Sequence, residues 1–224
     1  MTVWLSRLTL DPRSRAVRGD LLGGGSAISL HRRVMSLFPD IEANDARARF
    51  GVLFRVEDTP QGCALLVQST HEPDPARLPD GYGALLSRPL DPLLDALKPG
   101  RRIRYRCVAN AVRRPGATTR EVYKLKPVVP LGGRAADEWW RRQATAAGLE
   151  PESVLSQPLD AVRGPRGTHG AAANQRMRHD RTQFDGVATI VDADLLRERI
   201  VAGVGRAKSY GCGLLTVAPA GGAA

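Results

Sequence analysis

Apolar and polar positions alternate in the first half of the chain in the way that is typical of strands. Val3–Leu10 is rich in residues that favour strands, and every second residue from Phe50 to Val56 is apolar, which places those side chains on one face of a strand. Asp58–Gly62 has the composition of a turn, and Ala64–Gln68 returns as another strand. The pattern therefore predicts an N-terminal strand and, further along, a β-hairpin.

A helix is predicted between the first strand and the hairpin. Ser26 is a suitable N-cap, and the helix runs to Phe38, where Pro39 ends it. Glu72–Pro92 is rich in proline and glycine, with room for a short helix and a short strand before a boundary at Leu97–Gly100. The first half thus follows the order β-α-β-β-α-β.

The second half shows the same order of elements without repeating the sequence. Arg101–Val108 has a period of two, which puts Arg102, Arg104 and Arg106 on one face of a strand and apolar residues on the other. The elements predict an α+β protein of two tandem ferredoxin-like (β-α-β-β-α-β) domains, residues 1–97 and 98–224. Six further elements are predicted in the second half. The first three are a helix over Ala135–Gly148 with Trp139 and Trp140, a strand over Val154–Val162 and a loop over Gly164–Asn174. They are followed by a strand over Val187–Val191, a helix capped by Asp192 or Asp194 with Leu195, Leu196, Ile200 and Val204 as its apolar stripe, and a strand over Leu214–Val217.

The composition is that of a basic globular protein. Of its 224 residues, 42% are hydrophobic, which is enough for real cores. The formal net charge of +10 and the pI near 10.3 indicate an anionic partner, and nucleic acid is favoured over a membrane surface because no basic amphipathic helix of membrane type is visible. No stretch approaches the roughly 18 apolar residues of a membrane span, so we expect a cytoplasmic protein. The three cysteines lack metal-ligand spacing, so we expect no metal site and no cofactor.

Basic residues concentrate in two stretches, residues 101–126 and 163–181. Each stretch is either a surface that binds phosphates or an ordinary solvated face, and the sequence leaves both interpretations open. The second stretch includes a loop that is rich in glycine and alanine. The residues predicted from these stretches to contact nucleic acid are Arg102, Arg104, Arg106, Arg163, Arg166, Arg176, Arg178 and Arg181.

The segment Gly203–Leu215 is rich in glycine and lies between the last predicted helix and the last predicted strand. Glycine permits positive φ and a close approach of the backbone to a ligand, and Arg206 and Lys208 add charge. The spacing of a Walker phosphate-binding loop is absent, and the segment does not open a helix after a strand as a dinucleotide-binding motif does. From these residues alone, a tight structural turn and a ligand-binding surface remain equal alternatives.

Two segments at opposite ends of the chain resemble one family. Gly203–Leu215, followed by Val217–Pro219, looks like the C-terminal signature of the CasE family of type I-E CRISPR systems, which belongs to the repeat-associated RNA-binding proteins of ferredoxin-like fold. Leu30–Arg32, followed by Leu37–Pro39, is similar to the helix that bears the catalytic histidine of that family. The resemblance covers the whole chain and is loosest over residues 130–185.

The resemblance implies a metal-independent endoribonuclease. It would bind the stem-loop of precursor CRISPR RNA repeats, cleave at the base of the stem by attack of the 2′-hydroxyl, and stay bound to the mature guide as a subunit of the Cascade complex. His31 would act as acid or base, while Arg32 and Lys208 would stabilise charge on the phosphorane. The basic stretch 163–181 would supply a hairpin that enters the groove of the stem. Further residues that would contact RNA are Gly205, Arg206 and Ser209.

One position departs from the pattern of the family. Many members carry a tyrosine three residues before the histidine, where this chain has Ile28, which neither donates a proton nor titrates. Two alternatives therefore stand beside the enzyme: a non-catalytic subunit that caps the CRISPR RNA hairpin, and a basic protein of ribosomal type. The second alternative leaves both the glycine-rich segment and Leu30–Arg32 to chance.

Overall fold

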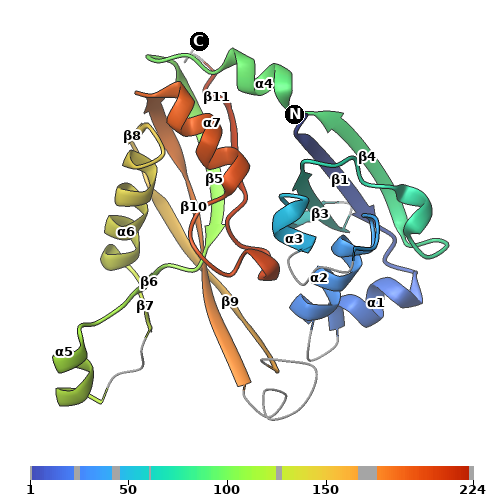
Figure 1. The fold of residues 1–224 in the computed structure, drawn as a ribbon, viewed down its shortest axis with the longest axis horizontal. Helices are drawn as coiled ribbons and strands as arrows, with labels where there is room; N and C mark the ends of the chain where they lie inside the picture. The colour runs from blue at the N-terminus through green and yellow to red at the C-terminus, as the bar shows by residue number, and fades with distance from the viewer. Residues whose placement is uncertain are drawn as a thin grey trace.

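The computed structural model describes residues 2–22, 26–41, 46–60, 62–124, 128–165 and 176–221. It shows an α+β protein with two main antiparallel sheets, one from each half of the chain, and a separate two-stranded sheet (Figure 1). Buried apolar side chains form two clusters, one associated mainly with each of the two main sheets. No helix in these ranges is long and apolar enough to cross a membrane.

The first sheet has the strand order β2-β3-β1-β4, and all neighbouring strands are antiparallel. The predicted N-terminal strand and hairpin are confirmed. Leu8, Val34 and Leu65 are completely buried in the cluster that joins the sheet to its helices. The elements are β1 (Trp4–Leu10), α1 (Arg15–Leu22), α2 (Ser26–Met35), α3 (Ala46–Arg49), β2 (Leu53–Thr59), β3 (Gly62–Ser69) and β4 (Gly83–Pro89).

The helical content of the first half differs from the prediction in two places. The helix from Ser26 is confirmed, although it ends at Met35 and not at Phe38. Another helix, α1, precedes it, and only Val17 of α1 is buried, so its sequence gives a weak helical pattern. The helix expected between β3 and β4 is a single 3₁₀ turn, η1 (Pro75–Arg77), capped by Asp74. A short helix, α4 (Asp91–Ala96), then leads to the second half.

The second sheet has the order β11-β5-β10-β8, with β9 also paired to β10. The ring planes of Trp140 and Phe184 stack at its core, with centroids 4.9 Å apart and an interplanar angle of 7°. In both sheets the last strand of the half lies beside the first, so β11 neighbours β5 as β4 neighbours β1. The elements are β5 (Arg102–Ala109), α6 (Arg134–Thr145), β8 (Leu149–Pro151), β9 (Leu155–Pro165), β10 (Arg176–Ile190), α7 (Ala193–Ala202), η3 (Lys208–Tyr210) and β11 (Leu215–Pro219).

Between β5 and α6 the chain forms an arm that the sequence pattern does not predict. It consists of β6 (Val112–Arg113), α5 (Ala117–Val122) and β7 (Val129–Pro130), and it extends away from the sheet (Figure 1). The hairpin of β9 and β10 also extends beyond the sheet, toward the side of α1 and α2 (Figure 1). These two projections leave basic segments away from the core.

Three predictions for the second half need correction or completion. Leu195 is wrong as a member of the apolar stripe, because it is 43% exposed while Leu196 and Ile200, four residues apart on α7, face the core. The strand expected over Val187–Val191 is the end of the longer β10. The loop predicted over Gly164–Asn174 falls mostly on residues outside the described ranges, and Gly164 itself belongs to β9. Asp192 caps α7 by accepting hydrogen bonds from the amides of Asp194 and Leu195.

Candidate functional site

Helix α2 presents His31 at the edge of the first core. The imidazole is half-buried and stacks on Phe54 of β2, with ring centroids 6.4 Å apart and an interplanar angle of 19°. Its Nδ1 atom is buried and has no hydrogen-bond partner among the described residues. Burial lowers the pKa of His31, and the charges of Arg47 and Arg32 lower it further. Burial and the two cations therefore both favour the neutral form of the ring, and its Nδ1 is shielded from solvent.

Arg47 is a site residue that the sequence analysis missed. It lies on the four-residue helix α3, where its Nη1 atom donates a 3.1 Å hydrogen bond to the backbone oxygen of Val52. The charge of its guanidinium lowers the pKa of both His31 and Lys208, so Arg47 lies close to both groups. The local sequence carries no signal for this role, because the proximity is created by tertiary packing.

Lys208 reaches the same region from the glycine-rich segment. The turn η3 packs against α2, and Nζ of Lys208 donates a 2.6 Å hydrogen bond to the backbone oxygen of Ala202. Burial is the main cause that lowers the pKa of Lys208, followed by the charges of Arg47 and Arg199. Arg47 is thus near both His31 and Lys208, and these three residues form the cationic cluster, with Arg32 exposed at the next position of α2.

The other predicted residues of the glycine-rich segment surround η3. A Cβ placed on Gly205 would lie 3.4 Å from the ring of Trp139, so this glycine packs on the second core. Arg206 is exposed and lowers the pKa of His179, although burial of that histidine is the larger cause. Ser209 is half-buried, and the neighbouring Tyr210 stacks on His179 with centroids 5.1 Å apart.

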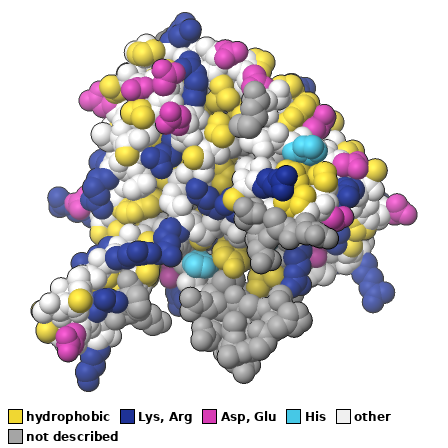
Figure 2. All heavy atoms as spheres, in the orientation of Figure 1, with side chains coloured by type: hydrophobic (Ala, Val, Ile, Leu, Met, Phe, Trp, Pro, Cys, Tyr) yellow, Lys and Arg dark blue, Asp and Glu magenta, His cyan; other side chains and the backbone are white. Residues whose placement is uncertain are grey.

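A hollow of about 370 Å³, the hairpin hollow, separates β2 from the basic hairpin. Phe54 and Val56 line it from β2, and Arg163 and Arg181 line it from β9 and β10. On the face shown in Figure 2, Lys and Arg side chains spread across the centre of the molecule, whereas Asp and Glu lie mainly at the periphery. The lining of the hairpin hollow thus combines the cations Arg163 and Arg181 with Asp160 and mainly apolar residues, beside the ring on which His31 stacks.

The predicted arginines of this hairpin differ in their surroundings. Nε of Arg181 donates to the backbone oxygen of Asp160 at 2.8 Å, and exposed Arg178 forms a 2.6 Å ion pair with Asp180. Arg176 belongs to β10, and Arg166 lies outside the described residues. Among the predicted hairpin arginines whose side chains are described, Arg163 is the one that is both exposed and part of the lining of the hairpin hollow.

A second hollow of about 520 Å³, the inter-sheet hollow, lies on the other face of β2. Arg55 and Glu57 line it, whereas Phe54 and Val56 line the hairpin hollow, as the alternation of side chains along a strand requires. Arg104 and Arg106 open into the inter-sheet hollow. The basic face predicted for β5 therefore exists, but the structure does not bring it together with His31.

Two of the three predicted arginines of β5 are already paired with acids. Arg102 forms an ion pair with Glu152 at 2.7 Å, and Arg106 forms one with Asp185 at 2.5 Å. Arg104 is exposed and forms no ion pair with an acid in the described ranges. This face is less positive than the sequence alone implies.

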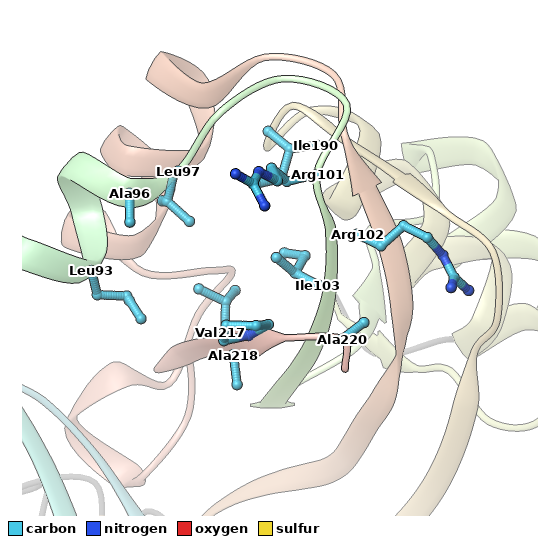
Figure 3. Close-up of a pocket in the computed structure, with 11 residues that line it drawn as sticks. Leu93, Ala96, Leu97, Arg101, Arg102, Ile103, Ile190, Val217, Ala218 and Ala220 are labelled. Carbon is cyan, nitrogen blue, oxygen red and sulfur yellow. The ribbon is translucent and has the colours of Figure 1, made fainter. Parts of the chain in front are cut away.

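A third hollow, about 340 Å³, lies between α4 and the strands β5 and β11 (Figure 3). Leu93, Leu97, Ile103 and Val217 line much of it, and Arg101 and Arg102 supply its charges. Because its lining residues include no histidine or carboxylate, it offers no group for acid–base chemistry near neutral pH. Among the described residues, no group of three or more His, Cys, Asp or Glu side chains is close enough to hold a metal ion.

The fold and the site define a basic α+β protein in which a half-buried histidine on α2 lies near Arg47, and the turn that carries Lys208 packs against the same helix. The model of a family described as CRISPR associated protein matches residues 3–219, which is nearly the whole chain. The protein belongs to this family, in the group of the CRISPR-associated Cse3/CasE endoribonucleases.

Individual relatives agree with this assignment. The chain is 32% identical to the CRISPR-associated endoribonuclease Cse3 of Thermus thermophilus, over 97% of this chain and 100% of that protein. It is 29% identical to the CRISPR system Cascade subunit CasE of Escherichia coli, over 85% of this chain and 90% of that one. A solved structure of the endoribonuclease Cse3 bound to a 19 nt RNA superposes with a TM-score of 0.77 and 29% identity, covering 98% of this chain and 100% of the other.

Proposed function

We propose that this protein is a metal-independent endoribonuclease that binds the stem-loop of precursor CRISPR RNA repeats and cleaves once at the base of the stem. The observation that carries the proposal is the half-buried His31, whose pKa is lowered by burial and by the charge of Arg47, a cation that also lowers the pKa of Lys208. Cleavage of RNA without a metal needs a group that exchanges a proton near neutral pH and charges that stabilise the phosphorane. The named activity of the relative Cse3 supports the same reading.

In the proposed reaction, the 2′-hydroxyl attacks the adjacent phosphorus and the bond to the 5′-oxygen breaks. The products are a 2′,3′-cyclic phosphate on one fragment and a 5′-hydroxyl on the other. His31 either accepts the proton of the 2′-hydroxyl or donates a proton to the 5′-oxygen. Arg32 and Lys208 stabilise the charge that develops on the non-bridging oxygens, and Arg47 is added to this pair because it adjoins both His31 and Lys208.

We assign the RNA stem to the hairpin of β9 and β10. Arg163 and Arg181 line the hairpin hollow, and Arg206 and Ser209 lie on the turn beside it. A-form RNA is recognised by its shape and phosphates, which suits a cationic hairpin. Arg102, Arg104 and Arg106 are not assigned to the same path, because Arg104 and Arg106 open into the inter-sheet hollow.

The domain organisation that we propose is two ferredoxin-like units, residues 1–97 and 98–224. In both sheets the first and last strands of the half are adjacent, β1 to β4 and β5 to β11, and this shared arrangement supports the division. His31 and Arg47 would then come from the first unit and Lys208 from the second, so the proposed site forms only where the two units meet. After cleavage the protein would stay on the guide as a Cascade subunit, in line with the name of the relative CasE.

A second candidate function is a non-catalytic subunit that caps the CRISPR RNA hairpin. Ile28 favours it, because an alkyl side chain stands where many relatives carry a tyrosine. The same cationic hairpin would bind RNA in that case, and only the chemistry would be absent.

One experiment separates the alternatives. The purified protein is incubated with an end-labelled repeat RNA in EDTA, and the products are resolved on a denaturing gel beside an RNA with a 2′-deoxy substitution at the cleaved position. Site-specific cleavage that the substitution abolishes supports the enzyme. Tight binding without cleavage supports the capping subunit, and binding that ignores the hairpin sequence supports a general basic protein.

A further inference from the structure

Three consecutive residues of β2 contact the glycine-rich segment at separate points. A Cβ placed on Gly203 would lie 2.8 Å from Cδ1 of Leu53, and one placed on Gly211 would lie 3.5 Å from the ring of Phe54. Arg55 then donates a 3.3 Å hydrogen bond to the backbone oxygen of Leu214. Gly203 and Gly211 therefore lie directly against β2, which explains these two glycines without a ligand.

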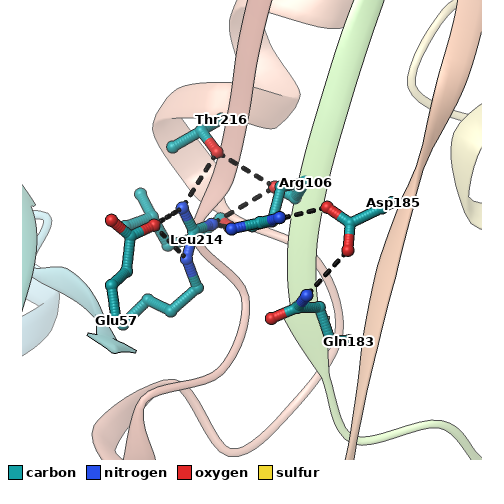
Figure 4. A network of polar contacts seen from close by, with 7 residues as sticks. Glu57, Arg106, Gln183, Asp185, Leu214 and Thr216 are labelled. Carbon is teal, nitrogen blue, oxygen red and sulfur yellow. Dashed lines mark hydrogen bonds and ion pairs between the residues drawn. The ribbon is translucent and has the colours of Figure 1, made fainter. Parts of the chain in front are cut away.

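Arg55 is the polar centre of this contact, and it is only 3% exposed. Figure 4 shows three of the residues that accept its hydrogen bonds, Glu57, Leu214 and Thr216. Its Nε and Nη2 atoms donate to Oε1 of Glu57 at 3.1 and 2.5 Å. Nη1 reaches the backbone oxygen of Arg106 at 3.3 Å, and Nη2 reaches the hydroxyl of Thr216 at 3.1 Å. One side chain of the first sheet thus binds both β5 and β11 of the second.

Burying an arginine between two sheets adds little net stability. Desolvation of the charge cancels much of the energy of its hydrogen bonds, and apolar replacements of similar volume are often as stable. What the guanidinium adds is direction, because its donors lie in a fixed plane and must meet several acceptors at once. Arg55 therefore specifies how the two sheets are placed more than it stabilises them.

That placement matters to the proposed site. Phe54, the residue before Arg55, holds the ring of His31, and Leu214 and Thr216, to which Arg55 binds, follow the turn that carries Lys208. We propose that Arg55 is a positioning residue, which sets His31 of the first half against Lys208 of the second half for the cleavage reaction. This inference rests on the proposed function, because His31 and Lys208 are positioned for the proposed cleavage of RNA.

The kinetic test compares Arg55→Met with Arg7→Met, in which an exposed arginine of β1 undergoes the same change. Single-turnover cleavage of a repeat RNA by Arg55→Met should fall roughly 10–100-fold, because a displacement of about 1 Å costs that much. Its affinity for a 2′-deoxy repeat RNA should stay within about threefold of wild type, since each half keeps its RNA-binding side chains. Arg7→Met should match wild type in both measurements. An unchanged rate for Arg55→Met, or equal losses of rate and affinity, would overturn the proposal.

A distance measurement tests placement without relying on catalysis. Spin labels are attached to Arg18→Cys and Glu198→Cys, exposed positions on α1 and α7, in a Cys63→Ser background that removes the accessible native thiol. Arg55→Met should broaden the distance distribution, and Arg7→Met should not. If Arg55→Met does not fold, Thr216→Val removes one acceptor of the guanidinium and should cause a smaller broadening of the same kind.

The two measurements distinguish failure of the inference from failure of the proposed function. A wild-type protein that binds repeat RNA without cutting it contradicts the proposed reaction, and then a broadened distance distribution shows that Arg55 places the sheets but positions no catalytic group. Cleavage by wild type combined with an unchanged distance distribution in both Arg55→Met and Thr216→Val contradicts the positioning role alone.

Discussion

The imidazole of His31 stacks on the ring of Phe54, with centroids 6.4 Å apart. This contact joins the helix that carries the candidate acid–base group to the strand that lies against the glycine-rich segment. The orientation of the imidazole therefore depends on packing between distant parts of the chain, and not on α2 alone. Arg47 of α3 lowers the pKa of the same histidine and η3 packs against α2, so the protonation and the position of the histidine both depend on tertiary packing.

Replacing His31 by alanine should abolish cleavage and leave RNA binding intact. Loss of a general acid or base costs roughly 10²–10⁴-fold in rate, whereas the arginines that we propose to bind RNA lie elsewhere. The checks are single-turnover cleavage and a filter-binding titration with the same repeat RNA. His71→Ala is the matched control, because His71 is exposed and lies outside the cationic cluster. Full activity of His31→Ala would remove this residue from the mechanism.

Replacing Arg47 by glutamine should raise the pKa of His31. The positive charge of Arg47 disfavours the imidazolium, so its removal makes the proton easier to bind, although burial keeps the pKa below the ordinary value. A titration of the His31 ring protons by NMR measures the shift, and the histidine-dependent limb of the pH–rate profile should move to higher pH with it. Arg49→Gln, on the same short helix but exposed, is the control and should leave the pKa unchanged. Equal titration curves for wild type and Arg47→Gln would contradict the placement of Arg47.

The sequence predicts those parts of the structure whose cause is local. Alternation from Phe50 to Val56 and the turn after it specify the hairpin, and the helical spacing puts His31 at the edge of the apolar face of α2. Arg55 falls on the polar face of the same strand, yet it is buried because carbonyl oxygens from the other sheet satisfy it. The local sequence pattern cannot predict acceptors that are so distant along the chain. For the same reason it does not predict that Arg47, on its four-residue helix, lies near His31.

Gly203→Ala should destabilise the protein much more than Gly205→Ala. Gly203 has φ 75° and ψ 162°, a region nearly restricted to glycine, and an added Cβ would lie 2.8 Å from Leu53 and 3.0 Å from the backbone oxygen of Gly213. Strain and overpacking together should cost about 2–5 kcal/mol. At Gly205 the nearest atom is 3.4 Å away, so the cost is that of positive φ alone, about 1–2 kcal/mol. Urea unfolding of both variants gives the comparison, and equal losses would mean that contact with β2 does not explain the glycine at position 203.

Arg163→Gln should reduce both the affinity for repeat RNA and its dependence on salt, whereas Arg102→Gln should change neither appreciably. Arg163 is exposed and lines the hairpin hollow, so a phosphate that it contacts releases a counterion, and the slope of log K against log salt should fall by about 1 on its loss. Arg102 is already paired with Glu152 at 2.7 Å. It would have to give up that carboxylate to bind a phosphate, and the lost ion pair cancels most of the free energy gained from the phosphate contact. Affinities measured at several salt concentrations separate the two residues. A larger change of slope for Arg102→Gln than for Arg163→Gln would move the RNA from the hairpin hollow to the basic face of β5.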